Sequence, residues 1–147
     1  MAAALACLLL LLVVAAGCGH KGPPRAADLV EPVAISDLTL VLGDRSVRLG
    51  WSHPRTARDG RPLTDLAGFV VYRKSTPADC PDCNAAYGER AMVSVEDEGR
   101  FFKQSEYKFT DTELQTGRVY RYRVRVLLSD GSLSRPSNEV SIEWQRQ

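Results

Sequence analysis

Apolar and polar residues alternate at every second position through most of the chain from Val33 onward. In the stretch from Arg45 to Ser52, for example, the odd-numbered positions from 47 onward are apolar: Val47, Leu49 and Trp51. Successive side chains of a β-strand point to opposite faces, so this period predicts strands that each bury one face. No stretch of ten or more residues keeps a helical period, and the sequence therefore predicts an all-β fold.

Seven short segments carry the strand pattern, and residues typical of turns separate them. The predicted strands are Val33–Leu42, Arg45–Ser52, Leu66–Lys74, Ala91–Val95, Tyr107–Thr110, Val119–Leu128 and Asn138–Trp144. Asp130-Gly131 lies between the last two and is a hairpin turn signal. Seven strands with this spacing predict an antiparallel β-sandwich of immunoglobulin-like architecture.

The chain begins with an apolar segment, residues 1–17, that contains no charged side chain. This segment is slightly shorter than the ~20 residues that span a bilayer, and glycines and prolines follow it at once. It therefore reads as a signal peptide that is removed. The positively charged start that is usual in such segments is missing, which leaves open a start upstream of Met1.

The stretch Ala15-Ala16-Gly17-Cys18 resembles the lipobox of bacterial lipoproteins, which usually has Leu where this chain has Ala15. The resemblance implies cleavage before Cys18 and attachment of a diacylglyceryl group to its thiol. Two or more acyl chains hold a protein stably on a membrane, so the expected partner of Cys18 is membrane lipid. The alternative is an ordinary cleaved signal peptide with an incidental cysteine.

Residues 18–32 are rich in Gly, Pro and Ala and are predicted to be a tether, so that the folded domain covers 33–147. Residues 18–23 look like the mature N-terminus of small lipoproteins of lipopolysaccharide assembly, which implies a Gram-negative source. Gly19, with no Asp after the lipidated cysteine, resembles the pattern of proteins released to the outer membrane. We therefore expect a periplasm-facing, lipid-anchored protein of the cell envelope.

From Pro32 to Trp144 the sequence resembles the fibronectin type III domain. Trp51 stands on the second strand where that family has its core Trp, and the stretch 68–73 looks like its third strand, with Phe69 in place of the usual Tyr. The resemblance implies a structural core that includes Trp51, Phe69, Leu114, Tyr120 and Tyr122. It also implies a tyrosine corner, in which the Tyr120 hydroxyl bonds to the backbone near Leu114.

Four cysteines are present, and only Cys80 and Cys83 lie in the predicted domain outside the signal peptide and the lipidation site. Their spacing is that of thioredoxin-type enzymes, so a periplasmic thiol-disulfide protein is an alternative function. The pair lies in a loop of an all-β domain without a following helix pattern, however, and we expect a structural disulfide.

No catalytic residue, cofactor or metal site is predicted. A structural zinc site needs four ligands, and the two histidines, His20 and His53, do not have a ligand spacing relative to the cysteines. Hydrolase motifs and phosphate-binding loops are absent from the sequence. A chain of this pattern is expected not to be an enzyme.

One surface is a candidate binding face. If Tyr120 and Tyr122 point inward, then Arg121, Arg123 and Arg125 form an outward stripe, with Tyr72 of the neighbouring strand beside them. Arginine beside tyrosine suits an acidic glycan, a lipid headgroup or an envelope protein. The alternative is a solvated sheet face, and the net charge of +1 argues against nucleic acid. The predicted function is an envelope-anchored interaction or spacer module.

Overall fold

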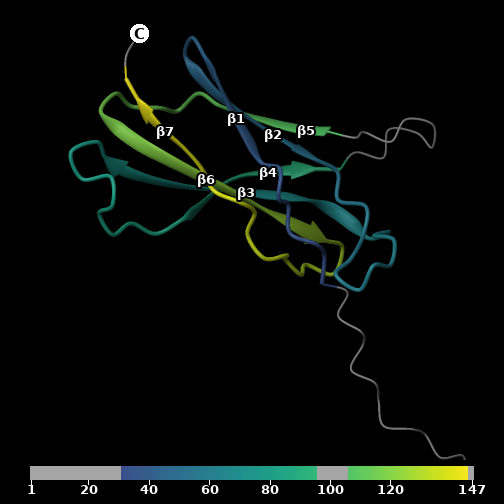
Figure 1. Ribbon diagram of the computed structural model, residues 1–147. Helices are drawn as coiled ribbons and strands as arrows, with labels where there is room; N and C mark the ends of the chain where they lie inside the picture. The colour runs from purple at the N-terminus through teal and green to yellow at the C-terminus, as the bar shows by residue number, and fades with distance from the viewer. Residues whose placement is uncertain (1–30, 96–105, 146–147) are drawn as a thin grey trace, which may run out of the picture.

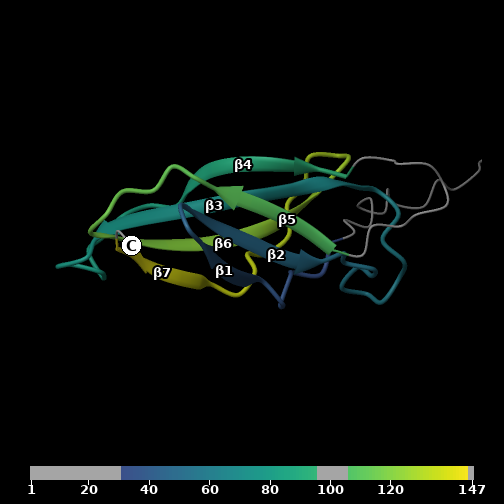
Figure 2. The ribbon, with the colours of Figure 1, turned by 90° about the horizontal axis from the view of Figure 1, so that it is seen from above.

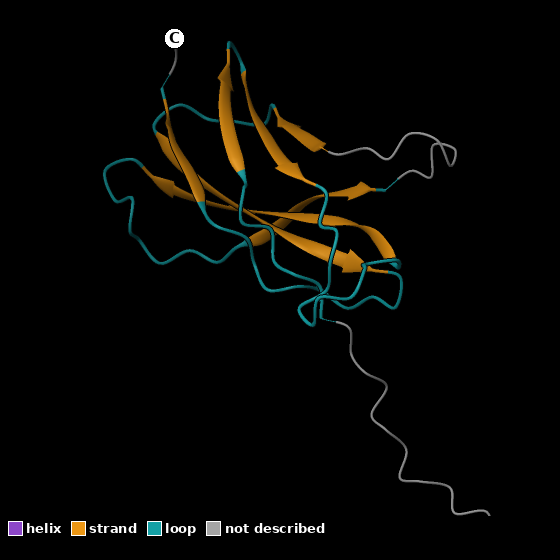
Figure 3. Cartoon of the chain, turned by 45° about the vertical axis from the view of Figure 1, so that its right-hand side comes forward, coloured by secondary structure: helices purple, strands orange, loops and turns teal. Residues whose placement is uncertain are grey.

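The computed structural model describes residues 31–95 and 106–145, and all regular structure in this part is β-strand (Figure 3). The strands are β1 Thr39–Gly43, β2 Ser46–Ser52, β3 Leu66–Pro77, β4 Gly88–Ser94, β5 Glu106–Asp111, β6 Arg118–Leu128 and β7 Val140–Trp144. Within the described ranges there is no helix long and apolar enough to cross a membrane. The predicted signal peptide, the tether up to residue 30 and Cys18 lie outside the described residues.

The strands form two antiparallel sheets that face each other. One sheet has the order β1-β2-β5 and the other the order β4-β3-β6-β7, and the two layers are seen in Figures 1 and 2. All strand pairs are antiparallel. The fold class predicted from the alternation, a seven-stranded antiparallel sandwich, is confirmed.

Alternation along the central strands fills the space between the sheets. On β6, Tyr120, Tyr122, Val124, Val126 and Leu128 are all at most 2% exposed, while the residues between them are half-buried. An aromatic cluster joins the layers, because the ring centroid of Phe69 on β3 lies 5.4 Å from Trp51 on β2 and 4.5 Å from Tyr107 on β5. Edge-to-face and tilted aromatic pairs of this kind add to the stabilisation by burial.

The first and last strands begin later than the alternation predicts, at Thr39 and Val140 instead of Val33 and Asn138. The Asn138 side chain contacts the residue that precedes β1. Its Oδ1 accepts a hydrogen bond from the Leu38 N–H at 3.0 Å, and its Nδ2 donates to the Leu38 carbonyl at 2.9 Å. A side-chain amide therefore replaces the strand pairing here.

The pairing of β3 with β4 contains a bulge. Val71 pairs with Ala91 and Tyr72 with Glu89, so Arg90 is the extra residue on β4. A bulge changes the direction of a side chain, and Arg90 points between the sheets as a result. Both strands are longer than predicted, since β3 continues to Pro77 and β4 begins at Gly88.

Different segments of the chain lie at the two ends of the sandwich. At one end Pro32 bridges to Ala57, and Glu31 forms an ion pair with Arg135 at 3.3 Å. At the other end lie the β3–β4 and β5–β6 loops and the end of β7, where the Gly117 N–H donates to the Trp144 carbonyl at 2.9 Å. Figures 1 and 3 show the entry of the described chain and the C-terminal strand end on opposite sides. We call the second end the distal pole.

Candidate functional site

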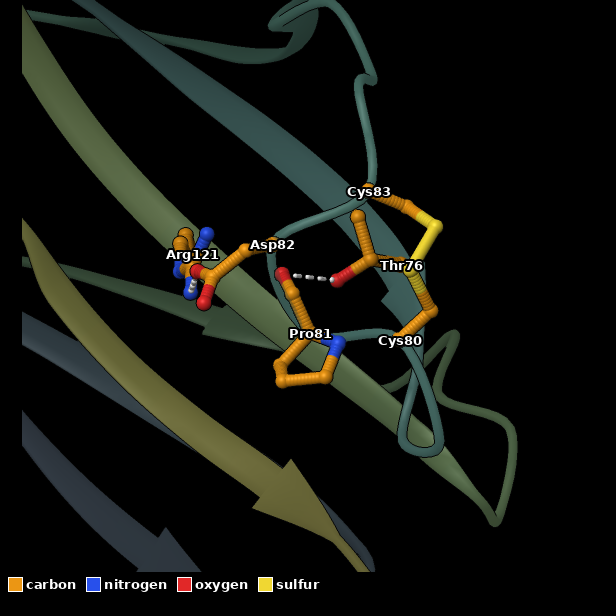
Figure 4. Close-up of a disulfide and its surroundings, with 6 residues drawn as sticks. All are labelled: Thr76, Cys80, Pro81, Asp82, Cys83 and Arg121. Carbon is orange, nitrogen blue, oxygen red and sulfur yellow. Dashed lines mark hydrogen bonds and ion pairs between the residues drawn. A yellow bond between two sulfur atoms is a disulfide. The ribbon is translucent and has the colours of Figure 1, made fainter.

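Cys80 and Cys83 form a disulfide in the loop that joins β3 to β4, with their Cα atoms 5.3 Å apart (Figure 4). Two successive turns bring the cysteines together. The Cys80 N–H donates to the Pro77 carbonyl and the Cys83 N–H donates to the Cys80 carbonyl, both at 3.1 Å. The sequence analysis predicts this disulfide, and the structure contains it.

The disulfide loop is fixed to the outer face of the β3–β6 pair. The Thr76 hydroxyl, on a residue only 1% exposed, donates to the Pro81 carbonyl at 3.0 Å. The Asp82 carboxylate forms an ion pair with Arg121 of β6 at 2.8 Å, and Figure 4 shows the two side chains meeting over the sheet. The bond therefore closes a loop that is anchored at two further points. In the described part of the chain no helix starts at this loop, so the usual source of an activated thiol is missing from it.

The predicted binding face lies on the outward side of β3 and β6. Tyr72 is paired in register with Arg123, and the neighbouring arginines alternate with buried residues as expected. The structure brings Tyr72, Arg121, Arg123 and Arg125 onto one face. The Tyr72 hydroxyl donates to Glu89 at 3.4 Å, a long and exposed bond.

The arginines of this face have partners within the chain. Arg123 forms an ion pair with Glu139 at 2.8 Å, and its guanidinium lies 4.7 Å from the centre of the Tyr87 ring. Arg121 reaches the same carboxylate at 3.7 Å, and Arg125 donates to the Ser134 carbonyl at 2.6 Å. The side chains of Arg121 and Arg123 are 19% and 39% exposed. The face is thus partly covered by the loop that carries Tyr87.

A hydrogen bond between Tyr87 and Glu139 completes this network. Burial and the bond to Glu139 raise the pKa of the Tyr87 hydroxyl. Burial acts against the charged form of Glu139, but Tyr87 and Arg123 outweigh it and hold the pKa of that carboxyl below its usual range. The carboxylate therefore stays ionised beside the arginines at neutral pH.

A buried polar network that the sequence analysis did not identify lies at the distal pole. The Asp111 side chain, at the end of β5, is 0% exposed. Its carboxylate forms ion pairs with Arg73 of β3 at 2.8 Å and Arg90 of β4 at 3.0 Å. It also accepts hydrogen bonds from the Tyr122 hydroxyl at 3.0 Å and the Glu113 N–H at 3.1 Å.

The network joins one sheet to the other, because β5 belongs to the first sheet and the arginines belong to the second. Burial raises the pKa of Asp111, but hydrogen bonds from Arg90 and Arg73 outweigh it, and the net shift is downward. The alternation of inward and outward residues could have predicted this network. Arg73 is the next inward position after Phe69 and Val71 on its strand, and Asp111 has the same parity as the buried Tyr107 on its strand. A charged residue at an inward position on both sheets predicts a pair between them.

The predicted core residues occupy the space between the sheets. Trp51, Phe69, Tyr120 and Tyr122 are at most 3% exposed, and Leu114 packs against them from the β5–β6 loop. The Tyr120 hydroxyl accepts a hydrogen bond from the Gln115 N–H at 2.7 Å, next to Leu114, where the family resemblance places the tyrosine corner. This hydrogen bond therefore fixes the β5–β6 loop, which connects one sheet to the other.

The described residues contain no group of three or more His, Cys, Asp or Glu side chains arranged to hold a metal ion. His53 lies with a ring nitrogen 3.2 Å from the Tyr107 hydroxyl and stacks on that ring. His20 lies outside the described ranges. Cys80 and Cys83, the cysteines of the described ranges, are joined to each other.

No protein-family model and no curated protein matches this sequence. Solved structures do match the fold. The third fibronectin III domain of human KIAA0343 protein is 13% identical with a TM-score of 0.54, and the match covers 88% of this chain and 95% of that one. A Fn3-like protein from Clostridium thermocellum is 19% identical with a TM-score of 0.50, over 79% of this chain and 96% of that one.

A third match is the twitchin kinase region from C. elegans, with a TM-score of 0.57 and 14% identity. It covers 79% of this chain but only 17% of the twitchin fragment, so this chain corresponds to one small part of it. Identities this low carry information about the fold alone. Together with the strand order and the aromatic core, the three structural matches show that the described chain is a fibronectin type III-like β-sandwich.

Proposed function

We propose that this protein is a cell-envelope lipoprotein, anchored through acylated Cys18, whose sandwich is a non-catalytic interaction or spacer module. The observation that carries the proposal is the lipobox-like stretch 15–18 at the end of a charge-free apolar segment. In the proposed arrangement the lipid holds the protein on the outer membrane, facing the periplasm. The folded domain then meets a partner, an envelope protein or a glycan, at a distance set by the tether.

The position of the domain entry is consistent with such a tether. The described chain enters the sandwich at the end opposite the distal pole, where Pro32 bridges to Ala57 (Figure 1). The thirteen residues 18–30 connect the proposed lipidation site to Glu31, the first described residue. At a maximum of ~3.6 Å per residue they reach at most about 47 Å. In the proposed arrangement the tether therefore joins the domain at the end opposite the distal pole.

The contacts of the side chains favour a module over an enzyme. The buried carboxylate Asp111 is fully bonded by two guanidinium groups, a hydroxyl and an N–H, which leaves it no free lone pair for proton transfer. Thr76 and Arg121 hold the cysteine loop on the sheet. These contacts support a structural disulfide over the alternative of a thiol-disulfide protein.

Membrane fractionation in a Gram-negative host tests the anchor. We expect the wild-type chain in the outer-membrane fraction, labelled by a palmitate analogue, and a Cys18→Ser variant without that label. A Cys80→Ser/Cys83→Ser variant is the matched control, since it changes thiols outside the proposed lipidation site. Label that persists in Cys18→Ser, or is absent from the wild type, would overturn the proposal.

A further inference from the structure

The inner faces of β3 and β6 change from apolar to cationic at the distal pole. Along β3 the inward positions run from Phe69 and Val71 to Arg73 and Ser75, and on β6 they end at Arg118. The change begins earlier on β3, because Arg73 and Ser75 pair with the buried Tyr122 and Tyr120, and β6 becomes cationic only at Arg118, opposite Pro77. The space between the sheets is therefore lined by polar groups at this end.

A cavity of about 660 Å³ opens at this place. Its lining includes Arg73, Ser75, Arg118 and Tyr120 from the strands, and Thr112 and Gln115 from the β5–β6 loop. The volume falls in the range of ~300–1,000 Å³ that is usual for small-molecule sites. The lining is mostly polar, so a polar ligand is expected.

One of the arginines around the cavity has no carboxylate partner among the described residues. The guanidinium groups of Arg73 and Arg90 are offset by the carboxylates of Asp111 and Glu113, to which they are bonded. Arg118 has no carboxylate within ion-pair distance in residues 31–95 and 106–145. It is oriented by Ser75, with Nε 2.5 Å from the Ser75 Oγ and Nη2 3.2 Å from the Ser75 carbonyl. One fixed positive charge therefore faces the cavity.

Neutral donors accompany this charge. The Tyr120 hydroxyl accepts from the Gln115 N–H, and its own proton has no acceptor among the residues that the structure describes. A guanidinium has five N–H groups in a fork, and the bonds to Ser75 use two of those of Arg118. The planar fork matches a carboxylate in two-pronged geometry.

We infer that this distal cavity binds a sugar acid, with the carboxylate on Arg118 and the Tyr120 hydroxyl. Sugar hydroxyls both donate and accept, and the rim offers both kinds of partner, with Glu113 and Gln115 as acceptors beside the donors. An acidic peptide is the less suitable ligand, because peptide sites depend on apolar anchor pockets and Leu114 is the one aliphatic side chain in this lining.

This inference rests on the proposed interaction module and names the chemistry of its ligand. It is tested by titrating the ¹⁵N-labelled full chain in detergent with glucuronate, glucose or a short acidic peptide, followed by amide NMR shifts. We expect saturable shifts in residues 73–75 and 112–120 with glucuronate, weaker at high salt, and none with glucose. Arg118→Gln should weaken binding about tenfold or more, as for loss of a charged hydrogen bond.

Arg48→Gln, at an exposed position of β2 outside the cavity lining, is the matched control and should bind as the wild type does. Ser75→Ala removes the hydroxyl that orients Arg118 but keeps the charge of that side chain, and it should also weaken binding. This second variant keeps the test valid if Arg118→Gln does not fold. Equal binding by glucose, tighter binding of the acidic peptide, or wild-type affinity in both cavity variants would overturn the inference. None of these outcomes changes the lipid label on Cys18, so failure of the site and failure of the anchor are separate results.

Discussion

The hydroxyl of Tyr122 on β6 donates a hydrogen bond of 3.0 Å to the Asp111 carboxylate on β5, and both side chains are 0% exposed. The bond crosses from one sheet of the sandwich to the other. Arg73 and Arg90 bind the same carboxylate, so four strands meet at one buried charge. A buried charge is tolerated only where it is paired and hydrogen-bonded, and the first two predictions concern this group.

Asp111→Asn should destabilise the domain by about 3 kcal/mol or more, since it leaves two guanidinium groups beside a neutral amide. Urea denaturation measures the change in the free energy of unfolding. Asp44→Asn, in the exposed β1–β2 turn, is the control and should alter that free energy by no more than about 0.5 kcal/mol. Equal stability of the two variants would show that the network does not stabilise the fold.

Acidification should weaken the wild-type domain through Asp111. Its pKa in the folded state lies below the ordinary value of 3.8, so the unfolded state binds more protons in this range. The stabilisation is complete above that value and is lost as the pH falls from about 4 through the folded-state pKa. Unfolding free energies measured from pH 6 to pH 2 should decline less steeply in Asp111→Asn, and parallel curves would contradict the assignment.

Gly68 should not accept a side chain. A Cβ at this position would lie 2.6 Å from the Val93 carbonyl oxygen of β4, and backbone atoms cannot move aside without loss of the β3–β4 pairing. We expect Gly68→Ala to cost about 1–3 kcal/mol, as overpacked sites do. Gly88→Ala in the same strand pair is the control, because its Cβ would meet open space. Chemical denaturation of both variants tests the difference.

Tyr120→Phe should leave the Gln115 N–H without its partner and lower the stability by about 1–2 kcal/mol. Hydrogen exchange of the Gln115 amide should accelerate in the variant. Tyr72→Phe removes a hydroxyl whose only bond within the described part of the chain is 3.4 Å long and exposed, so its effect should be close to zero. A larger effect at Tyr72 than at Tyr120 would contradict the geometry.

Removal of the disulfide should have a modest effect on the whole domain. Closing so short a loop restricts the unfolded chain little, and the Cys80→Ser/Cys83→Ser variant should lose about 2 kcal/mol. Because Asp82 bonds to Arg121 across the loop, the amide shifts that change should cluster around residues 76–87 and Arg121. NMR spectra of the two forms test this, and global unfolding of the variant would show that the bond supports more than its loop.

Strand alternation was sufficient to predict the fold because it depends on burial alone. The residues at inward parity on β2 and β6 lie in the core, and the seven segments fall at the observed places. Strand ends were less predictable. Next to the start of β1, the Leu38 backbone bonds to Asn138, which is 100 residues away, and no local pattern contains such information.

The candidate sites show the same limit. The stripe of Arg121, Arg123 and Arg125 follows from parity, but the cover by Tyr87 and Glu139 depends on how a loop folds back. Arg90 appears on the outward parity of its strand until the bulge turns it inward. The distal cavity likewise arises where a loop, two strands and Arg118 meet, which is a property of the assembled sheets.

The most direct test of the membrane-anchored module is the intact mass of the protein extracted with detergent from the outer membrane of a Gram-negative host. We expect a chain that starts at Cys18, carries the mass of a diacylglyceryl group with or without a further acyl chain, and retains the Cys80–Cys83 bond. A chain that still starts at Met1, or a cleaved chain without lipid mass, would contradict it.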